Sequence, residues 1–296
     1  MSLNYALVTP ARDEAENLRR LARCLAEQTV QPNAWLVVDD GSTDGTADIA
    51  RELARALPWL RLLSSPGAQS KDGPLESGRR AGRDIIAFTT GVQALQREPD
   101  IVLKLDADVS FAPDFFERLL DEFEADPRLG IAGGTCWERM RDEWRPYHVT
   151  GRHVRGATRA YRWQCLQDVS PLEEQIGWDV VDEMRANLRG WRTRSIASLP
   201  FYHHRGLGER DGARREWEAQ GRMAHYLGYR ISYLLARTLW RARTERAAVA
   251  MLTGYVGAAW RHERRCPDEL RAYLRRDQRL RKLPLRVREA LGRGAS

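Results

Sequence analysis

The chain has 296 residues, 43% of them apolar and 30% charged, which is typical of a folded protein and excludes a wholly disordered one. Its net charge is +7, but residues 261–296 hold twelve Lys/Arg and five Asp/Glu, which leaves 36 of each sign in residues 1–260. The main part of the chain is therefore neutral. This argues against a nucleic-acid-binding module, which needs basic residues around its binding face.

Apolar runs alternate with amphipathic segments through the first 110 residues. The apolar runs predict buried strands at residues 5–10, 34–38, 60–63 and 101–105. Leucine and alanine spacing predicts helices at residues 14–28, 47–57 and 85–96. This alternation predicts an α/β fold with a mixed, mostly parallel sheet and helices on both faces. The long connection at residues 64–82 has a length usually reserved for function.

The second half of the chain is less regular. Patterns there predict strands at residues 129–136 and 196–202, helices at 114–124 and 179–188, and mostly helix from 216 onward. We place a boundary near Asp211. It divides the chain into an α/β domain at residues 1–210, with halves at about 1–110 and 111–210, and a helical, basic C-terminal extension at residues 211–296.

The spacing of the cysteines and the length of the apolar stretches indicate the cellular compartment of the protein. Cys24, Cys136, Cys165 and Cys266 are far apart in the sequence, which predicts buried thiols rather than a zinc knuckle or a redox motif. We see no export signal, and the longest apolar stretch, residues 247–260, falls short of the ~20 residues that span a bilayer. We therefore expect a cytoplasmic protein.

Asp106 and Asp108 follow the predicted strand at residues 101–105, with Ala107 between them. Alternate residues of an extended chain face the same side, so both carboxylates can point into one cleft. Paired carboxylates of this kind hold Mg²⁺ or Mn²⁺ on a nucleotide diphosphate and offset its negative charge. The same residues also suit a solvated turn, and taken alone the motif does not decide between the two.

A second acidic turn, Asp39-Asp40-Gly41-Ser42, ends the predicted strand at residues 34–38. Its carboxylates can accept hydrogen bonds from a nucleobase N–H or from ribose hydroxyls. A local turn and helix cap favours the same residue types and stands as the alternative. In parallel sheets ligands bind at the carboxyl ends of strands, so we expect both acidic turns to lie at the ligand site.

Three segments, in this order, resemble the family 2 glycosyltransferases, which have the GT-A fold. Residues 8–18 are similar to the family's first-strand segment, and residues 37–45 are similar to its acidic turn. The segment from Lys104 to Asp108 is similar to its metal-binding motif. The resemblance covers roughly residues 4–210. It implies an inverting enzyme that moves a sugar from a nucleotide diphosphate to an acceptor hydroxyl, in cell-surface polysaccharide or glycolipid assembly.

The resemblance also implies a donor site with Mn²⁺ or Mg²⁺ as cofactor. Asp108 would hold the cation directly, and Asp106 would face both the cation and the ribose. His203, with His204 as the alternative, would complete the ligands. Arg79 or Arg83 would offset the negative charge of the phosphates. The nucleoside pocket would be lined by Pro10, Arg12, Glu14 and Asp40.

An inverting transfer needs a carboxylate that accepts the proton of the acceptor hydroxyl. By resemblance this base lies about eleven residues before the Gly-Trp pair at residues 190–191, which places it at Asp179. Trp178 and Asp182 would line the acceptor site. Asp182 as the base, or a helix cap without catalytic role, are the alternatives. Gly156 resembles a family glycine under the donor sugar and acceptor, with a bulged strand as its alternative.

Aromatic and leucine residues of the extension recur at helical spacing between residues 226 and 240, flanked by arginines. They predict helices that pack on the α/β domain or lie on an anionic membrane surface, here the inner face of the cell membrane. The expected partners are a nucleotide-diphospho-sugar and a glycan or lipid-linked acceptor, without nucleic acid. A sugar-phosphate nucleotidyltransferase is the alternative enzyme class, but residues 10–14 lack its usual Gly-rich loop.

Overall fold

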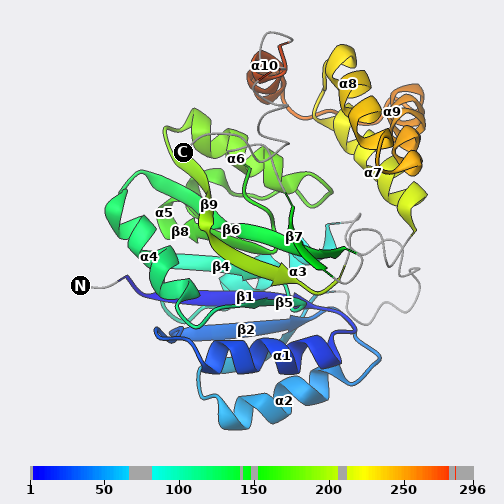
Figure 1. The fold of residues 1–296 in the computed structure, drawn as a ribbon. Coiled ribbons are helices and arrows are strands. Elements are labelled where there is room, and N and C mark those ends of the chain that lie inside the picture. The colour runs from blue at the N-terminus through cyan, green and yellow to red at the C-terminus, as the bar shows by residue number, and fades with distance from the viewer. Residues whose placement is uncertain are drawn as a thin grey trace.

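The computed structural model describes residues 3–66, 82–140, 143–147, 153–205, 212–279 and 284. Arg79 and the boundary expected near Asp211 lie outside the described residues, as does most of the chain after residue 279. Figure 1 shows a sheet covered by helices, with the C-terminal helices gathered to one side of it.

Strands and helices alternate through the first 105 residues, as predicted. The elements are β1 (Tyr5–Ala11), α1 (Ala15–Ala26), β2 (Ala34–Asp39), α2 (Thr46–Ala56), β3 (Leu60–Ser64), α3 (Arg83–Gln93) and β4 (Ile101–Leu105). β1 pairs in parallel with β2 and β4, and β2 pairs in parallel with β3. The carboxyl ends of these strands therefore meet at one edge of the sheet.

The second half of the chain extends the same sheet. Its elements are β5 (Val109–Phe111), α4 (Phe115–Ala125), β6 (Leu129–Met140), β7 (Glu143–Pro146), β8 (Thr158–Arg162), α5 (Trp163–Val169), α6 (Trp178–Leu188) and β9 (Arg192–His203). The strand order is β3-β2-β1-β4-β8-β6-β9-β5, with β7 paired to β6. β8 runs antiparallel to β4 and β6, whereas β6 and β9 are parallel. The mixed sheet and α/β class predicted from the sequence are confirmed.

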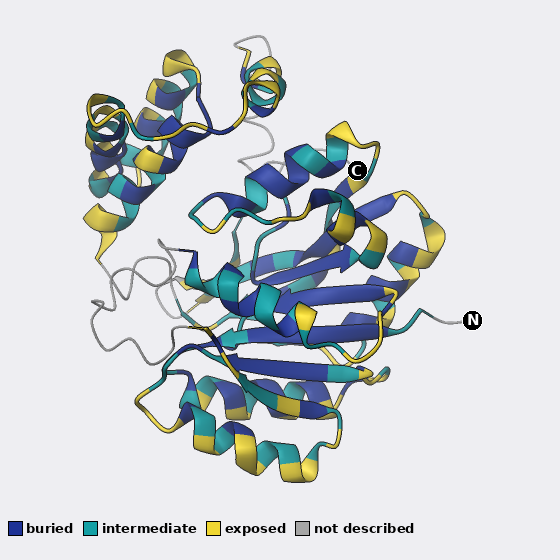
Figure 2. Cartoon of the chain, turned by 180° about the vertical axis from the view of Figure 1, so that it is seen from behind, coloured by how far each residue is buried: buried dark blue, intermediate teal, exposed yellow. Residues whose placement is uncertain are grey.

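Neighbouring residues of the central strands bury their side chains on opposite faces of the sheet. Leu7 of β1 belongs to the apolar core shared with α1 and α4, and Val8 to the core shared with α3 and α6. Successive side chains of a strand point to opposite faces, so a strand covered on both sides reads as an unbroken apolar run. Figure 2 shows these strands as buried between half-exposed helices.

The C-terminal region is helical, as predicted. Its elements are α7 (Ala213–Tyr226), α8 (Ile231–Ala242), the 3₁₀ helix η3 (Arg246–Val249), α9 (Ala250–Trp260) and α10 (Asp268–Asp277). α7 and α9 meet backbone to backbone, because a Cβ atom at Gly221 or Gly254 would lie 2.0 Å from a carbonyl oxygen of the other helix. These helices share a buried cluster with Val181 and Met184 of α6. No described helix combines the length and apolar character that crossing a membrane requires.

Candidate active site

The strand ends of the N-terminal half carry the acidic turns that the sequence predicts. Asp40 follows β2 and Asp106 follows β4, while Glu14 lies in the turn between β1 and α1. The backbone N–H of Glu14 donates to the hydroxyl of Thr46 at 2.8 Å, which joins the turn after β1 to the start of α2. The turns therefore form one continuous rim along this edge of the sheet.

Asp106, Asp108 and His203 lie together at this rim. His203 ends β9, and its antiparallel partner in β5 is Val109, next to Asp108. Each residue offers a ligand atom within 4.8 Å of the others, and Nε2 of His203 is 3.2 Å from Oδ1 of Asp108. Two carboxylates and an imidazole suit a divalent cation such as Mn²⁺ or Mg²⁺. The side chains therefore fit the predicted cation, and their role as ligands remains a prediction.

Asp108 is a buried carboxylate that stays ionised. Burial alone would raise its pKa, but the hydrogen bond and charge of His203, together with the charge of Arg205, lower the pKa of Asp108 to about 2. A charged group held in a mostly buried position attracts an opposite charge more strongly than one in water does. Asp108 is therefore well suited to bind a cation directly.

Arg205 contacts the same group from just beyond β9. Its Nη1 and Nη2 atoms each lie 2.7 Å from a carboxylate oxygen of Glu14. Nη1 also lies 3.5 Å from Oδ2 of Asp108. Arg205 thus places a positive charge between the predicted nucleoside pocket and the predicted cation site.

Asp40 is engaged by arginines on the nucleoside side of the rim. Nε of Arg83 donates to Oδ2 of Asp40 at 2.7 Å, and Nη2 of Arg83 donates to Oδ1. Nη1 of Arg12 lies 4.0 Å from Oδ2 of the same carboxylate. Pro10 lies in β1 opposite Val38 of β2. The structure therefore pairs Arg83 with Asp40, and a role of Arg83 at the phosphates stays a prediction.

Trp178 connects the cation site to the start of α6. Nζ of Lys104 lies 5.6 Å from the Trp178 ring centroid and donates to Oδ1 of Asp106 at 2.6 Å. A Cβ atom at Gly156 would lie 3.0 Å from Cζ2 of Trp178, so this close approach favours glycine. Trp178 is only 5% exposed. Its ring lies beneath Lys104 and Gly156, and its place in the acceptor site stays a prediction.

Asp179 lies in the first turn of α6, and its side chain is 22% exposed. Nε2 of His153 lies 3.6 Å from its Oδ2, and Nδ1 of His153 lies 3.2 Å from Oε2 of Glu183. Burial opposes the charge of His153, but Glu183 and Asp179 together raise the pKa of His153 above its ordinary value of 6.5. His153 therefore bridges two carboxylates and fixes the position of the predicted base.

Asp182 is a buried carboxyl group. Nη2 of Arg159 donates to its Oδ1 at 2.6 Å, Nε donates to Oδ2 at 3.0 Å, and the hydroxyl of Tyr161 also donates to Oδ2. Burial raises the pKa of Asp182 to about 7, and the charge of Arg159 opposes a further rise. The side chain is 1% exposed. Its carboxyl group is enclosed by Arg159 and Tyr161, and its place in the acceptor site stays a prediction.

Sequence reasoning assigned no role to four residues of this region, Lys104, His153, Arg159 and Arg205. Lys104 carries a usable signal, since a lysine inside an otherwise apolar strand needs a nearby acid. Arg159 and Arg205 stand among many other arginines, and His153 follows no motif. Their importance comes from partners that are far away in the sequence, so the fold was needed to identify them.

Fold and site together define an α/β protein of the GT-A class with a carboxylate-rich cation site at its strand ends. The model of glycosyl transferase family 2 matches residues 6–170. The chain belongs to this family.

Among its relatives, the polyprenol monophosphomannose synthase of Mycolicibacterium smegmatis is 34% identical over 143 residues, or 45% of this chain and 49% of the relative. The undecaprenyl-phosphate mannosyltransferase of Micrococcus luteus is 30% identical over 68% of this chain and 84% of the relative. The succinoglycan biosynthesis protein ExoA of Rhizobium meliloti is 30% identical, but the match covers 33% of its length. The chain thus spans half or less of the first and third of these proteins.

Solved structures agree on the fold. The mannosyltransferase PcManGT from Pyrobaculum calidifontis, in complex with GDP-Man and Mn²⁺, superposes with a TM-score of 0.57 at 15% identity, covering 98% of this chain and 85% of that protein. GalNAc-T7 with UDP, GalNAc and Mn²⁺ also superposes with a TM-score of 0.57, at 13% identity, and the match covers 76% of this chain and 48% of that protein. At these identities the likeness establishes the fold alone.

Proposed function

We propose that this chain is an inverting glycosyltransferase that moves a sugar from a nucleotide diphosphate to an acceptor hydroxyl. The observation that carries the proposal is the cluster of Asp106, Asp108 and His203 at the strand ends. Through Lys104 and Trp178 this cluster is linked to the start of α6, where Asp179 lies. A donor-side cation site and an acceptor-side carboxylate within one edge of the sheet are the two parts that this chemistry requires.

On the donor side, Asp106, Asp108 and His203 hold a divalent cation, Mn²⁺ or Mg²⁺. When bound, that cation offsets the negative charge that develops on the departing diphosphate. Asp40 and Arg12 face the nucleoside, and the pairing of Arg83 with Asp40 fixes the direction of that carboxylate. Arg205 supplies further positive charge beside Glu14 and Asp108.

On the acceptor side, Asp179 accepts the proton of the attacking hydroxyl. The hydroxyl oxygen forms a bond to the anomeric carbon as the bond from that carbon to the diphosphate oxygen breaks, so the configuration inverts. His153 positions the Asp179 carboxylate through the contact at 3.6 Å. A carboxylate at this place favours a neutral hydroxyl acceptor over an ionised phosphate, because like charges in one site repel each other.

The relatives narrow the substrates to test first. Two are named as a polyprenol monophosphomannose synthase and an undecaprenyl-phosphate mannosyltransferase, and one solved neighbour holds GDP-Man. We infer GDP-mannose as the first donor to test, and a hydroxyl of a lipid-linked glycan as the acceptor, in the assembly of cell-surface polysaccharide or glycolipid.

We further propose that the extension contacts the cytoplasmic face of a membrane. Three apolar residues spaced four apart on α8 are exposed: Ile231 (55%), Leu235 (45%) and Leu239 (70%). Residues 230–265 contain eight arginines and two acidic residues, a net charge of +6. An exposed apolar row within a strongly basic segment is the combination that anionic lipid surfaces bind.

A direct test is a screen of GDP-, UDP- and dTDP-sugars with and without Mn²⁺. Binding should require the cation, and hydrolysis or transfer of one donor should exceed that of the others. A chain that binds each nucleotide sugar equally well with and without a divalent cation would contradict the donor-site assignment.

A further inference from the structure

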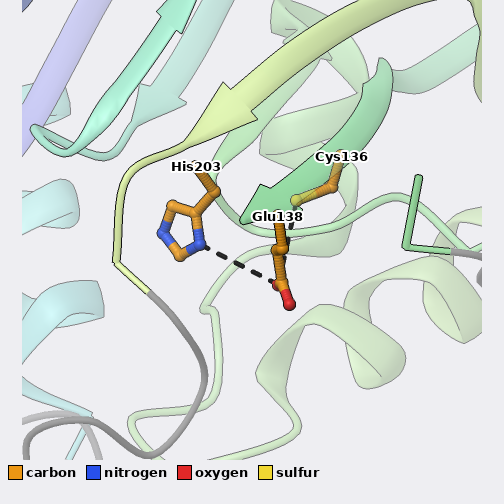
Figure 3. A group of neighbouring side chains, drawn as sticks. All are labelled: Cys136, Glu138 and His203. Carbon is orange, nitrogen blue, oxygen red and sulfur yellow. Dashed lines mark hydrogen bonds and ion pairs between the residues drawn. The ribbon is translucent and has the colours of Figure 1, made fainter. Parts of the chain in front are cut away.

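A second group of metal-binding side chains lies beside the predicted donor cation. It consists of Cys136, Glu138 and His203, whose ligand atoms lie within 4.8 Å of one another (Figure 3). Cys136 and Glu138 are alternate residues of β6 and therefore face the same side. The parallel register of β6 and β9 sets Glu138 opposite His203. The fold thus brings a thiol, a carboxylate and an imidazole to one point.

The two ring nitrogens of His203 face different groups. Nε2 lies 3.2 Å from Oδ1 of Asp108, whereas Nδ1 is buried, 4.0 Å from Oε1 of Glu138, with no hydrogen-bond partner in the part of the chain that the structure describes. In the neutral imidazole, a proton on Nε2 donated to Asp108 leaves a lone pair on Nδ1. Metal-bound histidines commonly donate their other N–H to a carboxylate, which is the role that Asp108 has here.

We propose that Cys136, Glu138 and Nδ1 of His203 bind a zinc ion at a site separate from the donor cation. Thiolate, imidazole and carboxylate are zinc ligands, whereas Mg²⁺ and Mn²⁺ favour oxygen ligands over sulfur. Three protein ligands leave one tetrahedral position for water. On binding, the S–H bond of Cys136 breaks, the sulfur ligates the ion as thiolate, and the proton leaves to solvent. Nη1 of Arg155 donates to Oε1 of Glu138 at 2.7 Å and orients that carboxylate.

Zinc at this site competes with the donor cation for His203. A neutral imidazole has one free lone pair, so zinc on Nδ1 keeps the proton on Nε2 and removes His203 from the ligands of the donor cation. Zinc therefore weakens Mn²⁺ binding at Asp106 and Asp108. This competition rests on the proposed function, whereas zinc binding itself does not.

Cobalt is the probe for the thiolate ligand, because Co²⁺ bound to sulfur absorbs in the near ultraviolet. Metal-free full-length protein titrated with Co²⁺ should develop this band up to one equivalent, and one equivalent of Zn²⁺ should remove it. Cys136→Ser and Cys136→Ala should lose the band. Cys165→Ser, which alters another buried thiol, and Asp106→Ala, which alters only the donor site, should keep it. Absence of the band in the wild type, or its survival in both folded Cys136 variants, overturns the site.

Competition is measured by the electron paramagnetic resonance of free Mn²⁺. One equivalent of Zn²⁺ should decrease the Mn²⁺ bound by the wild type and leave the Mn²⁺ bound by Cys136→Ser unchanged. If the wild type shows the cobalt band but binds Mn²⁺ equally well with zinc present, the shared use of His203 is wrong. If no form binds Mn²⁺ while the cobalt band persists, the donor site fails and the zinc site stands.

Discussion

Arg205 and Glu14 form a two-bond ion pair across 191 residues of sequence, with Nη1 and Nη2 each 2.7 Å from a carboxylate oxygen. The same guanidinium lies 3.5 Å from Asp108. Arg205 and a divalent cation are therefore both attracted by the negative charge of Asp108. In the absence of nucleotide, the positive charge of Arg205 should oppose binding of the cation.

Arg205→Ala should accordingly bind Mn²⁺ more tightly than the wild type does. A partly exposed ion pair is worth up to about 1 kcal/mol, so the gain should be roughly fivefold at most. Isothermal titration with Mn²⁺ alone measures it. Arg19→Ala is the matched control, because Arg19 pairs with Glu52 on the surface formed by α1 and α2. Weaker Mn²⁺ binding by Arg205→Ala would show that Arg205 supports the cation.

Asp108→Ala should abolish the Mn²⁺-dependent part of nucleotide diphosphate binding. Losing a residue that only supports a metal ligand costs about 10–100-fold in affinity, and losing the main ligand should cost more. Titration of UDP and GDP with and without Mn²⁺ measures the difference. Asp48→Ala removes an exposed carboxylate of α2 and should leave both affinities unchanged. Equal Mn²⁺-dependent affinity in Asp108→Ala would remove the assignment of the cation site.

His153 gives the fold a dependence on pH. Its pKa is raised above the ordinary 6.5 by Glu183 and Asp179, so its charged form stabilises the folded state. That stability is fully present below the unfolded pKa and is lost as the pH rises through the higher folded value. The free energy of unfolding by urea should therefore fall as the pH rises above the ordinary pKa of 6.5. His153→Gln should make this fall smaller, and the raised pKa of Asp182 accounts for the slope that remains. An identical slope in His153→Gln would place the titrating group elsewhere.

Sequence patterns predicted the residues whose position follows from strand geometry. Asp40, Asp106 and Asp108 end or follow apolar strands, and parallel strands bring such ends to one edge of a sheet. The strands β5 and β7 have three and four residues, too few for a period of two to be recognised. Local pattern therefore located the acidic turns and missed these two short strands.

Contacts between distant segments could not be predicted in the same way. Asp182 and Asp179 are three residues apart on one helix and carry the same charge, yet one is enclosed by Arg159 and the other faces His153. The difference depends on Arg159 in β8 and His153 before it, which only the fold brings to α6. The same holds for Cys136, whose nearness to His203 requires the pairing of β6 with β9.

The exposed row on α8 should determine membrane binding. Replacing Leu235 and Leu239 by serine removes apolar area that would enter the interface, and each buried CH₂ group contributes about 0.8 kcal/mol. Full-length protein should sediment with vesicles rich in anionic lipid at low salt, and the double variant should stay in solution. Deleting residues 261–296 is a poorer test, because Leu270 of α10 belongs to the buried cluster. Equal sedimentation of both forms would exclude the row as the contact.

The catalytic base is tested by contrasting Asp179 with Asp182. Asp179→Asn keeps the shape of the side chain but removes its ability to accept a proton, so donor affinity should persist while turnover falls at least about a hundredfold, the lower end of the effect of general-base catalysis. Asp182→Asn should instead lose about 3 kcal/mol of stability near pH 8, because it leaves buried Arg159 without its main partner. Single-turnover rates and urea unfolding of both variants separate the roles. If folded Asp182→Asn is inactive and Asp179→Asn turns over normally, the base must be reassigned. If both variants turn over normally when folded, α6 supplies no base.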